Sequence, residues 1–186
     1  MNEETPEVVV LVDEDDNVLG TAPKSSVHTA ATPLHRAFSL FLFDVPQGRL
    51  LLQQRSHVKK TWPLVWSNSV CGHPGLDETN VDAAKRRLAH ELRMSATHIE
   101  QAAPYRYCFT RDGVMENEIC PILVGLTLDQ PNPNRDEVEA TRWVRWQDFL
   151  QEIETKPGFY SPWCEEEVRI LDGLPRFHEL LANRGK

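Results

Sequence analysis

The segment GHPGLDETNVDAAKRRLAHELRM, residues 72–94, carries the clearest helical pattern in the chain. Its apolar side chains recur at intervals of three and four residues, which is the spacing of one helical face. These side chains are Val81, Ala84, Leu88 and Leu92. Thr79 or Asn80 is suited to cap the start, and Asp82 places a negative charge in the first turn. The segment therefore predicts a loop with glycine and proline, followed by a helix over residues 79–94.

Strands are predicted on both sides of this helix. Before it, residues 7–13 and 18–20 predict a hairpin, and residues 35–44 and 49–55 predict a second strand pair. After it, strands are predicted over residues 104–110, 115–128 and 139–146, and closing helices over residues 148–153 and 161–181. Strands outnumber helices and their order is mixed, which predicts an α+β or α/β/α fold with a mixed sheet.

The composition is typical of a globular protein. The chain has 186 residues, of which 40% are hydrophobic, and this suits one domain, residues 1–186, with a sizeable core. No apolar run reaches the roughly 18 residues needed to cross a bilayer, and the acidic start MNEETPE does not have the pattern of a signal peptide. We therefore expect a cytoplasmic protein with no membrane partner. In that compartment the cysteines are expected to be free thiols: Cys71, Cys108, Cys120 and Cys164.

The formal net charge of −8 argues against a nucleic-acid partner, because a surface that binds duplex nucleic acid needs clustered Lys and Arg. A local basic cluster would still hold a small anion. The basic candidates are Lys24, Arg55, Lys59 and Arg87, although each of them taken alone suits an ordinary surface.

Cys71 and His73 are separated by a single residue. A thiol and an imidazole at this spacing are metal ligands, a nucleophile with its base, or a chance pair in a loop. The spacing alone leaves these three interpretations open.

Glu116 and Glu118 alternate along a predicted strand and therefore share one of its faces. Two neighbouring carboxylates are either exposed on a solvated edge strand or compensated by a divalent cation. His28, His35 and His73 lie at predicted loop and strand ends. Together with the paired carboxylates, these imidazoles favour a His/Glu site for an ion such as zinc, manganese or iron.

Arg87 and Glu91 lie four residues apart on the predicted helix, beside its apolar face. In one interpretation they form an intrahelical ion pair worth about 0.3 kcal/mol. In the other, Glu91 faces the interior and holds Mg²⁺ together with phosphate oxygens, while Arg87 helps to bind the anion.

The spacing from Gly72 onward resembles the Nudix box, G-x5-E-x7-R-E-U-x-E-E-x-G-U, in which U is an aliphatic residue. The matching positions are Gly72, Glu78, Arg86, Leu88, Glu91 and Met94. Arg87 and His90 stand where Nudix hydrolases carry glutamates, and Arg93 replaces the late glycine. In that family the glutamates organise the metals and activate the water that cuts a diphosphate. Their loss is expected to cripple hydrolysis here.

These departures, together with NSVCGHP (68–74) and ENEICP (116–121), resemble the type I isopentenyl-diphosphate Δ-isomerases over most of the chain. The resemblance implies a Nudix-like α/β/α sandwich that turns isopentenyl diphosphate into dimethylallyl diphosphate by protonating and deprotonating the alkene. It implies a divalent ion, Mn²⁺, Zn²⁺ or Mg²⁺, whose ligands are His28, His35, His73, Glu116 and Glu118. It also implies a second ion, Mg²⁺, that bridges Glu91 to the diphosphate.

The same resemblance implies roles for the residues around the substrate. Cys71 and Glu118 match the catalytic pair, and Tyr107 and Trp163 match the aromatic residues that close on the alkene. The positions that match diphosphate-binding residues are Lys24, Arg55, Lys59 and Arg87. The expected partner is a small diphosphate, and the expected oligomeric state is a monomer or weak homodimer.

Two other functions fit parts of the sequence. A Nudix pyrophosphohydrolase would release monophosphate from a nucleoside diphosphate derivative and would not need Cys71. A non-enzymatic interaction domain would use His28, His35 and His73 as a structural metal site and would unfold when the metal is removed. The motifs around Cys71 and Glu118 argue against both.

Overall fold

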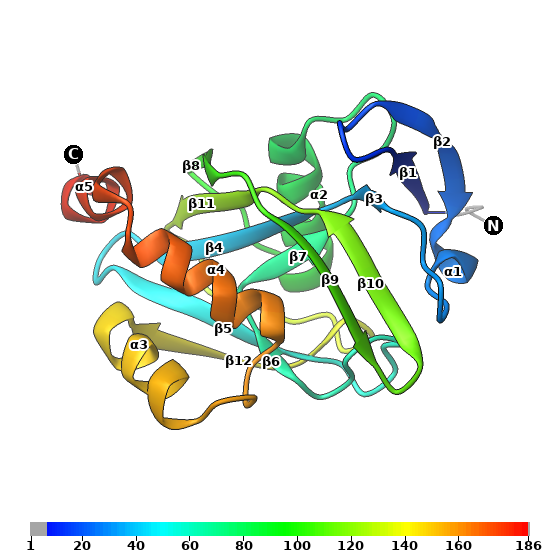
Figure 1. The fold of residues 1–186 in the computed structure, drawn as a ribbon. Coiled ribbons are helices and arrows are strands. Elements are labelled where there is room, and N and C mark those ends of the chain that lie inside the picture. The colour runs from blue at the N-terminus through cyan, green and yellow to red at the C-terminus, as the bar shows by residue number, and fades with distance from the viewer. Residues whose placement is uncertain (1–6, 186) are drawn as a thin grey trace.

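The computed structural model describes residues 7–185, whose strands form two β-sheets (Figure 1). The larger sheet consists, in order, of β12 (Val138–Arg145), β5 (Arg49–Arg55), β4 (Phe38–Asp44), β11 (Ile122–Thr127) and β8 (His98–Ala103). Two short strands extend it: β6 (Trp66–Ser67) pairs with β5, and β7 (Val70–Gly72) pairs with β4. The smaller sheet consists, in order, of β2 (Val18–Pro23), β1 (Val8–Val12), β3 (His35–Arg36), β10 (Val114–Ile119) and β9 (Arg106–Arg111).

Two stretches of chain pass from the smaller sheet into the larger one. β3 is followed by β4 after Ala37, and β10 is followed by β11 after Cys120 and Pro121. β3 runs parallel to β10, and β4 runs parallel to β11. Hydrogen bonds from Ala37 N to Ile119 O (2.8 Å) and from Ser39 N to Pro121 O (3.2 Å) keep the two stretches together through the crossing. Residues from both sheets therefore meet at this point.

Helices cover both faces of the larger sheet (Figure 1). α2 (Asn80–Leu92) lies on one face, and α3 (Trp146–Thr155), α4 (Pro162–Asp172) and α5 (Pro175–Asn183) lie on the other. A single helical turn, α1 (Lys24–Val27), follows β2. The predicted fold class, an α/β/α sandwich with a mixed sheet, is confirmed.

The central strand β4 contributes to two apolar cores because its side chains alternate between the faces of the sheet. Leu40 and Leu42 pack in the core that includes Leu88 of α2, whereas Phe41 and Phe43 pack in the core on the side of α3–α5. All of these side chains are fully buried. Because both faces are covered, the strand has a continuous apolar sequence rather than an alternating one.

The helix predicted over residues 79–94 is confirmed as α2. Thr79 caps its start, with the Asp82 amide donating a hydrogen bond to Thr79 Oγ1 at 3.1 Å. The helix ends at Leu92, and Arg93 follows in the left-handed region with φ 51° and ψ 40°. Glycine is the usual residue in this conformation at a helix end. Arg93 therefore holds a backbone conformation that usually belongs to glycine.

Several predicted elements differ in detail. The single strand predicted over residues 115–128 is wrong: it is two strands in different sheets, and the break falls at Pro121, which has no N–H for a ladder. The strand predicted over residues 35–44 is likewise interrupted, at Ala37. Cys71 lies on the short strand β7, which was not predicted. Neither β8 nor α1 was predicted, because HIEQAA is largely polar and α1 is only one turn long.

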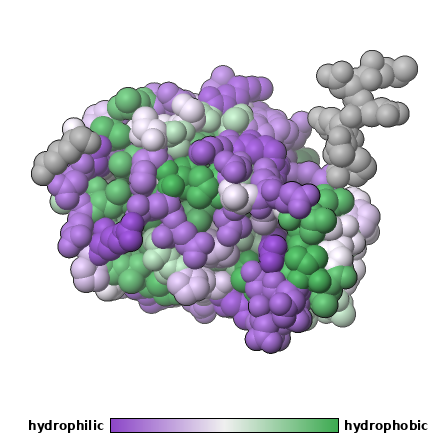
Figure 2. All heavy atoms as spheres, turned by 90° about the horizontal axis from the view of Figure 1, so that it is seen from above, coloured by the Kyte–Doolittle hydropathy of each residue, from purple (hydrophilic) through white to green (hydrophobic). Residues whose placement is uncertain are grey.

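The predicted N-terminal hairpin is confirmed as β1 and β2, which pair antiparallel. None of the helices in residues 7–185 has the length and apolar character needed to cross a membrane. Seen from above, hydrophilic side chains are interspersed with smaller hydrophobic areas (Figure 2). Such a mixture is ordinary for the surface of a folded protein.

Candidate active site

A cavity of about 410 Å³ is lined by residues from both sheets and from α1, α2 and α4. The predicted site residues on its wall are Lys24, His28, Arg55, Lys59, Cys71, His73, Arg87, Tyr107, Glu116, Glu118 and Trp163. Two further predicted residues, His35 and Glu91, are buried behind the wall. The structure therefore brings residues that are far apart in the sequence to one cavity.

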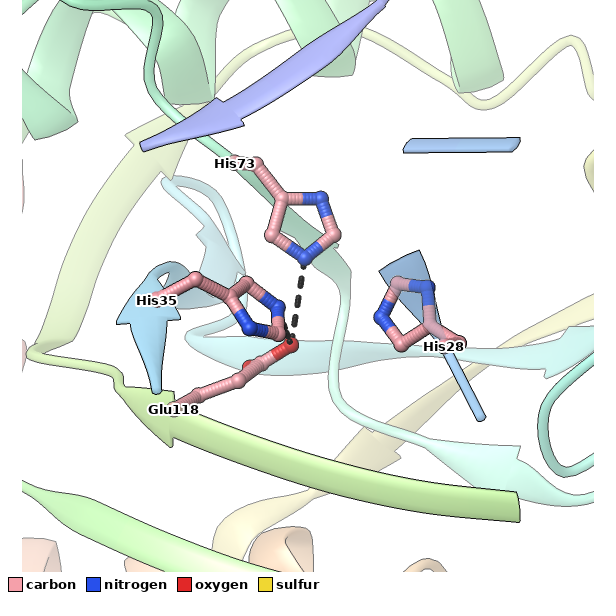
Figure 3. Close-up of side chains that lie close together, drawn as sticks. All are labelled: His28, His35, His73 and Glu118. Atoms are coloured by element: carbon pink, nitrogen blue, oxygen red, sulfur yellow. Dashed lines mark hydrogen bonds and ion pairs between the residues drawn. The ribbon is translucent and has the colours of Figure 1, made fainter. Parts of the chain in front are cut away.

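Three histidines surround the carboxylate of Glu118 (Figure 3). One ligand atom from each of these four residues lies within 4.8 Å of the others. Oε1 of Glu118 lies 3.1 Å from Nε2 of His73 and 3.3 Å from Nε2 of His35. The third histidine, His28, has its Nε2 atom 3.0 Å from Oε2 of Glu116. Five side chains from four segments of chain thus converge.

The strand register explains part of this convergence. His35 on β3 is the direct register partner of Glu118 on β10, so the two side chains lie on the same face. Glu116 lies two residues earlier on that face. The loop before β3 is fixed to β10 because the Thr32 hydroxyl donates a hydrogen bond to Met115 O at 2.6 Å. Each glutamate is only 5% exposed, which excludes the interpretation as a solvated edge strand.

The unpaired atoms of this cluster fit a divalent cation. Nε2 of His28, Nε2 of His35 and Oε2 of Glu116 are buried and have no hydrogen bond of good geometry within residues 7–185, because their nearest polar neighbours are other potential ligand atoms of the same cluster. Buried polar atoms without partners are costly, whereas imidazole nitrogens and carboxylate oxygens together suit zinc, manganese or iron. Nδ1 of His35 lies 2.9 Å from Pro33 O, an arrangement that favours the tautomer with a free Nε2 lone pair. Burial lowers the pKa of His73 to about 4, so its ring is neutral, the form that binds cations.

Cys71 is held on the cavity wall by polar neighbours. Its Sγ donates to Oδ1 of Asn68 at 3.2 Å and lies 3.6 Å from Oγ of Ser39. Burial and the nearby carboxyl group of Glu167 raise the pKa of Cys71 to about 12, so the thiol is protonated at neutral pH. Within residues 7–185 its sulfur is not one of the clustered ligand atoms, whereas His73 contributes one. All four cysteines are free, as predicted.

Tyr107 connects the His/Glu cluster with the aromatic wall of the cavity. Its hydroxyl donates to Oε2 of Glu118 at 2.6 Å, and its ring stacks on Trp163 with centroids 5.6 Å apart and planes at 17°. Burial by itself raises the pKa of Glu118, but the imidazoles of His35 and His73, whose Nε2 atoms lie 3.3 and 3.1 Å from its Oε1, hold it well below its usual range. Glu118 is therefore a carboxylate at neutral pH.

Basic side chains line a further part of the cavity. Lys24 Nζ lies 2.6 Å from Glu7 Oε2, and Lys59 forms an ion pair with Glu137. Arg55 Nη2 donates to Thr61 O at 2.8 Å. These pairs hold the cations at the cavity, and a phosphate group that entered would meet them there.

Arg87 and Glu91 form the predicted pair on α2, but the pair is buried. Arg87 Nε and Nη2 donate to Glu91 Oε1 at 3.0 and 2.7 Å, and Gln53 Nε2 donates to Glu91 Oε2 at 3.2 Å. The two residues are 3% and 2% exposed. The stabilisation of about 0.3 kcal/mol that an exposed intrahelical ion pair contributes therefore does not apply to this pair. Removal of either side chain would leave the other as an uncompensated buried charge. Glu91 lies one layer behind the wall, in contact with Arg87.

Four residues beside the site were not predicted. Asn68 lies inside the motif NSVCGHP, where an amide close to a thiol could have been noticed. Glu167 follows Trp163 by four residues on α4, and this spacing places both on one helical face. Glu7 and Glu137 carry no local signal, because only the fold brings them to the basic side chains.

The geometry can be compared with that of known proteins. The family model of the NUDIX domain matches residues 33–164. The isopentenyl-diphosphate Delta-isomerase of Mycolicibacterium vanbaalenii is 44% identical over 171 residues, covering 91% of this chain and 93% of that protein. The enzyme of the same name from Kocuria rhizophila is 45% identical over 167 residues, covering 89% and 92%. A crystal structure from Deinococcus radiodurans has a TM-score of 0.67 at 21% identity, covering 88% of this chain and 98% of that one, and supports the fold alone.

Proposed function

Because the chain belongs to the NUDIX family, and within it to the isopentenyl-diphosphate Delta-isomerases, we propose that it converts isopentenyl diphosphate into dimethylallyl diphosphate. One observation carries this proposal: a thiol, Cys71, and a carboxylate, Glu118, line one cavity beside an aromatic stack. The reaction moves a carbon–carbon double bond and leaves the diphosphate intact.

The reaction needs two proton-transfer groups. The electron pair of the terminal double bond takes up a proton at the end carbon. The methylene on the other side of the central carbon then loses a proton, and the electrons of that C–H bond form the new double bond. Sγ of Cys71 and the carboxylate of Glu118 are the two groups that we assign to these transfers. The Tyr107 hydroxyl, which donates to Glu118, orients the carboxylate.

An unactivated alkene is a very weak base, so the reacting carbon acquires the character of a tertiary carbocation. Such a centre must be kept from water and stabilised electrostatically. Trp163 is 2% exposed and stacked on Tyr107, which provides a desolvated aromatic surface. The face of an indole stabilises a desolvated cation by about 2 kcal/mol.

The diphosphate supplies binding energy away from the reacting carbons. We assign its binding to the basic side chains of the cavity, Lys24, Arg55, Lys59 and Arg87. Energy from this remote contact positions a small alkene that offers few contacts of its own. Arg87 and His90 replace the glutamates with which hydrolases of the family activate water. The scaffold would therefore still bind a diphosphate but would not activate water to cut it.

The ion-binding groups are assigned in the same way. His28, His35, His73, Glu116 and Glu118 would hold one divalent ion, Mn²⁺, Zn²⁺ or Mg²⁺, and the unpaired buried atoms of the cluster support this. Glu91 would hold a Mg²⁺ shared with the diphosphate. When bound, the ion of the His/Glu site sets the acidity of the Glu118 carboxyl group.

The test is proton NMR of isopentenyl diphosphate incubated in D₂O with metal-loaded protein, with Cys71→Ala measured alongside. We expect deuterated dimethylallyl diphosphate from the wild type and none above background from the variant. An unlabelled alkene and an intact diphosphate would refute the isomerase activity. Release of monophosphate from a nucleoside diphosphate derivative, with full activity in Cys71→Ala, would instead identify a hydrolase.

A further inference from the structure

The Glu7 carboxylate bridges two of the cations that we assign to the diphosphate. Its Oε2 lies 2.6 Å from Lys24 Nζ, and its Oε1 lies 2.9 Å from Arg87 Nη1. Glu7 directly precedes β1 and lines the cavity. Its position there is fixed by the hairpin, because Lys24 N donates to Glu7 O at 2.8 Å. A negatively charged group of the protein thus occupies the place between these two cations.

Each guanidinium nitrogen of Arg87 already contacts a carboxylate. Nε and Nη2 donate to Glu91, Nη1 donates to Glu7, and Nη2 also lies 3.1 Å from Glu137 Oε2. A guanidinium binds phosphate best with two parallel N–H groups. Only one N–H, on Nη1, is left over, so binding of a phosphate group by two N–H groups of Arg87 requires one of these carboxylates to leave.

Glu7 is the carboxylate that leaves most easily. Its side chain is 43% exposed, compared with 3% for Glu91 and 16% for Glu137. Glu91 also accepts a hydrogen bond from Gln53, and the Glu137 carboxylate also pairs with Lys59 and His90. An exposed carboxylate regains water when its ion pairs break, whereas a buried one is left without compensation.

We propose that Glu7 is an internal anion that holds the place of a phosphate group, and that an entering diphosphate must displace its carboxylate. Glu7 would then act as a determinant of specificity. A single phosphate gains little by exchanging with a carboxylate, whereas a diphosphate displaces Glu7 and also reaches Arg55 and Lys59 on the wall of the same cavity. This inference rests on the proposed function, since that function assigns Lys24 and Arg87 to the diphosphate.

Titration calorimetry with inorganic phosphate and inorganic pyrophosphate, each with Mg²⁺, tests the inference on wild type and Glu7→Gln. We expect Glu7→Gln to bind phosphate about fivefold more tightly, because two partly exposed ion pairs no longer compete. In Glu7→Gln, the ratio of the affinity for pyrophosphate to the affinity for phosphate should be smaller than in the wild type. Unchanged or weaker binding of both anions by Glu7→Gln would overturn the inference.

Glu14→Gln is the matched control. Glu14 lies in the turn between β1 and β2, forms an ion pair with Arg106 at 2.8 Å, and is not on the cavity wall. We expect this variant to bind both anions as the wild type does. Tightening in Glu14→Gln equal to that in Glu7→Gln would show a general charge effect and would also overturn the inference.

A second variant at the same position guards against misfolding. Glu7→Asp keeps the charge but shortens the side chain by one methylene, so the bridge between Lys24 and Arg87 is weakened. We expect its affinity for phosphate to lie between those of wild type and Glu7→Gln, with thermal denaturation confirming that both variants are folded. An affinity of Glu7→Asp below that of wild type would contradict the displacement.

The outcome also separates this inference from the proposed function. If the wild type binds no pyrophosphate, and Arg87→Gln changes nothing, the assignment of the diphosphate site itself fails. If the wild type binds pyrophosphate and Arg87→Gln weakens it, the site stands. In that case the response of Glu7→Gln decides the role of Glu7 alone.

Discussion

His35 and Glu118 face each other across the parallel strands β3 and β10, with Nε2 of the histidine 3.3 Å from Oε1 of the glutamate. Each strand leads on into the other sheet, so both residues are fixed by paired backbone rather than by a loop. His28, in contrast, follows the single turn α1. The cluster therefore combines three donors on paired strands, His35, Glu116 and Glu118, with two on connecting segments, His28 and His73.

This arrangement predicts that His28→Ala loses the divalent ion. Removal of one ligand should weaken binding at least about tenfold. Elemental analysis of the purified variant measures the loss, and thermal denaturation with and without a chelator measures its effect on folding. The wild type should melt lower after chelation, because an ion that binds only the native state stabilises it. His57→Ala, which removes an exposed histidine outside the cluster, should keep its metal; equal metal content in the two variants would contradict the site.

Tyr107→Phe should lower kcat while the protein stays folded. The substitution keeps the ring that stacks on Trp163 and removes only the hydroxyl that donates to Glu118. A hydrogen bond to a charged group contributes about 1.5–3 kcal/mol, which corresponds to a loss of roughly ten- to a hundredfold in rate. Steady-state kinetics should show little change in KM, since the hydroxyl is bonded to Glu118 and not to a basic residue. A raised KM with normal kcat would place Tyr107 in substrate binding instead.

Arg93→Gly should stabilise the protein by about 0.5–1 kcal/mol. Arg93 has φ 51° at the end of α2, a conformation that costs energy for a side chain with a Cβ atom. The guanidinium contact that would be lost, to Asn132 at 3.3 Å, is exposed and contributes little. Denaturant unfolding measures the gain.

The control for this change is Arg169→Gly on α4. Arg169 is an exposed residue inside a helix, so glycine there should destabilise by about 1 kcal/mol. If both variants are destabilised alike, the positive φ of Arg93 carries no strain.

Residues whose placement follows from a local sequence pattern were predictable from the sequence. α2 follows from its apolar spacing, and Glu116 with Glu118 follows from the alternation of a strand. Glu116 and Glu118 share one face of the strand, as predicted, even though the strand ends earlier than predicted. The alternation of side chains depends only on neighbouring residues and not on the length of the strand. Cys71 and His73 were recognisable within a short motif.

Residues that reach the site through the fold alone were not predictable. Pro121 separates two strands that belong to different sheets, and nothing near it in the sequence shows that the chain changes sheet there. The same crossing sets His35 against Glu118. Glu7 and Glu137 meet Arg87 only after the hairpin and the loop before β12 have folded onto α2. Such contacts join residues far apart in the chain, so composition and spacing carry no trace of them.

We expect Glu167 to make the stability of the protein depend on pH, and we expect substitution of Glu167 to remove this dependence. Its side chain is fully buried on α4, and neither carboxyl oxygen has a hydrogen-bond partner within residues 7–185. Burial, to which the nearby Glu118 charge adds, raises the pKa of Glu167 well above its usual range. The folded protein therefore keeps the proton at pH values where the unfolded chain has released it.

The sign of the effect follows from this difference in bound protons. Below about pH 4, the carboxyl group is protonated in both states, so it makes no pH-dependent contribution to the free energy of unfolding. As pH rises above that value, only the unfolded state ionises, so the free energy of unfolding falls by up to about 1.4 kcal/mol per pH unit until the folded group also titrates. Glu167→Gln should melt close to wild type at pH 4 and progressively higher than wild type from pH 5 to pH 8. Glu166→Gln, an exposed neighbour on α4, should show no such divergence, and a Glu167→Gln variant that melts lower at every pH would mean that the carboxyl group is ionised and stabilised in the native protein.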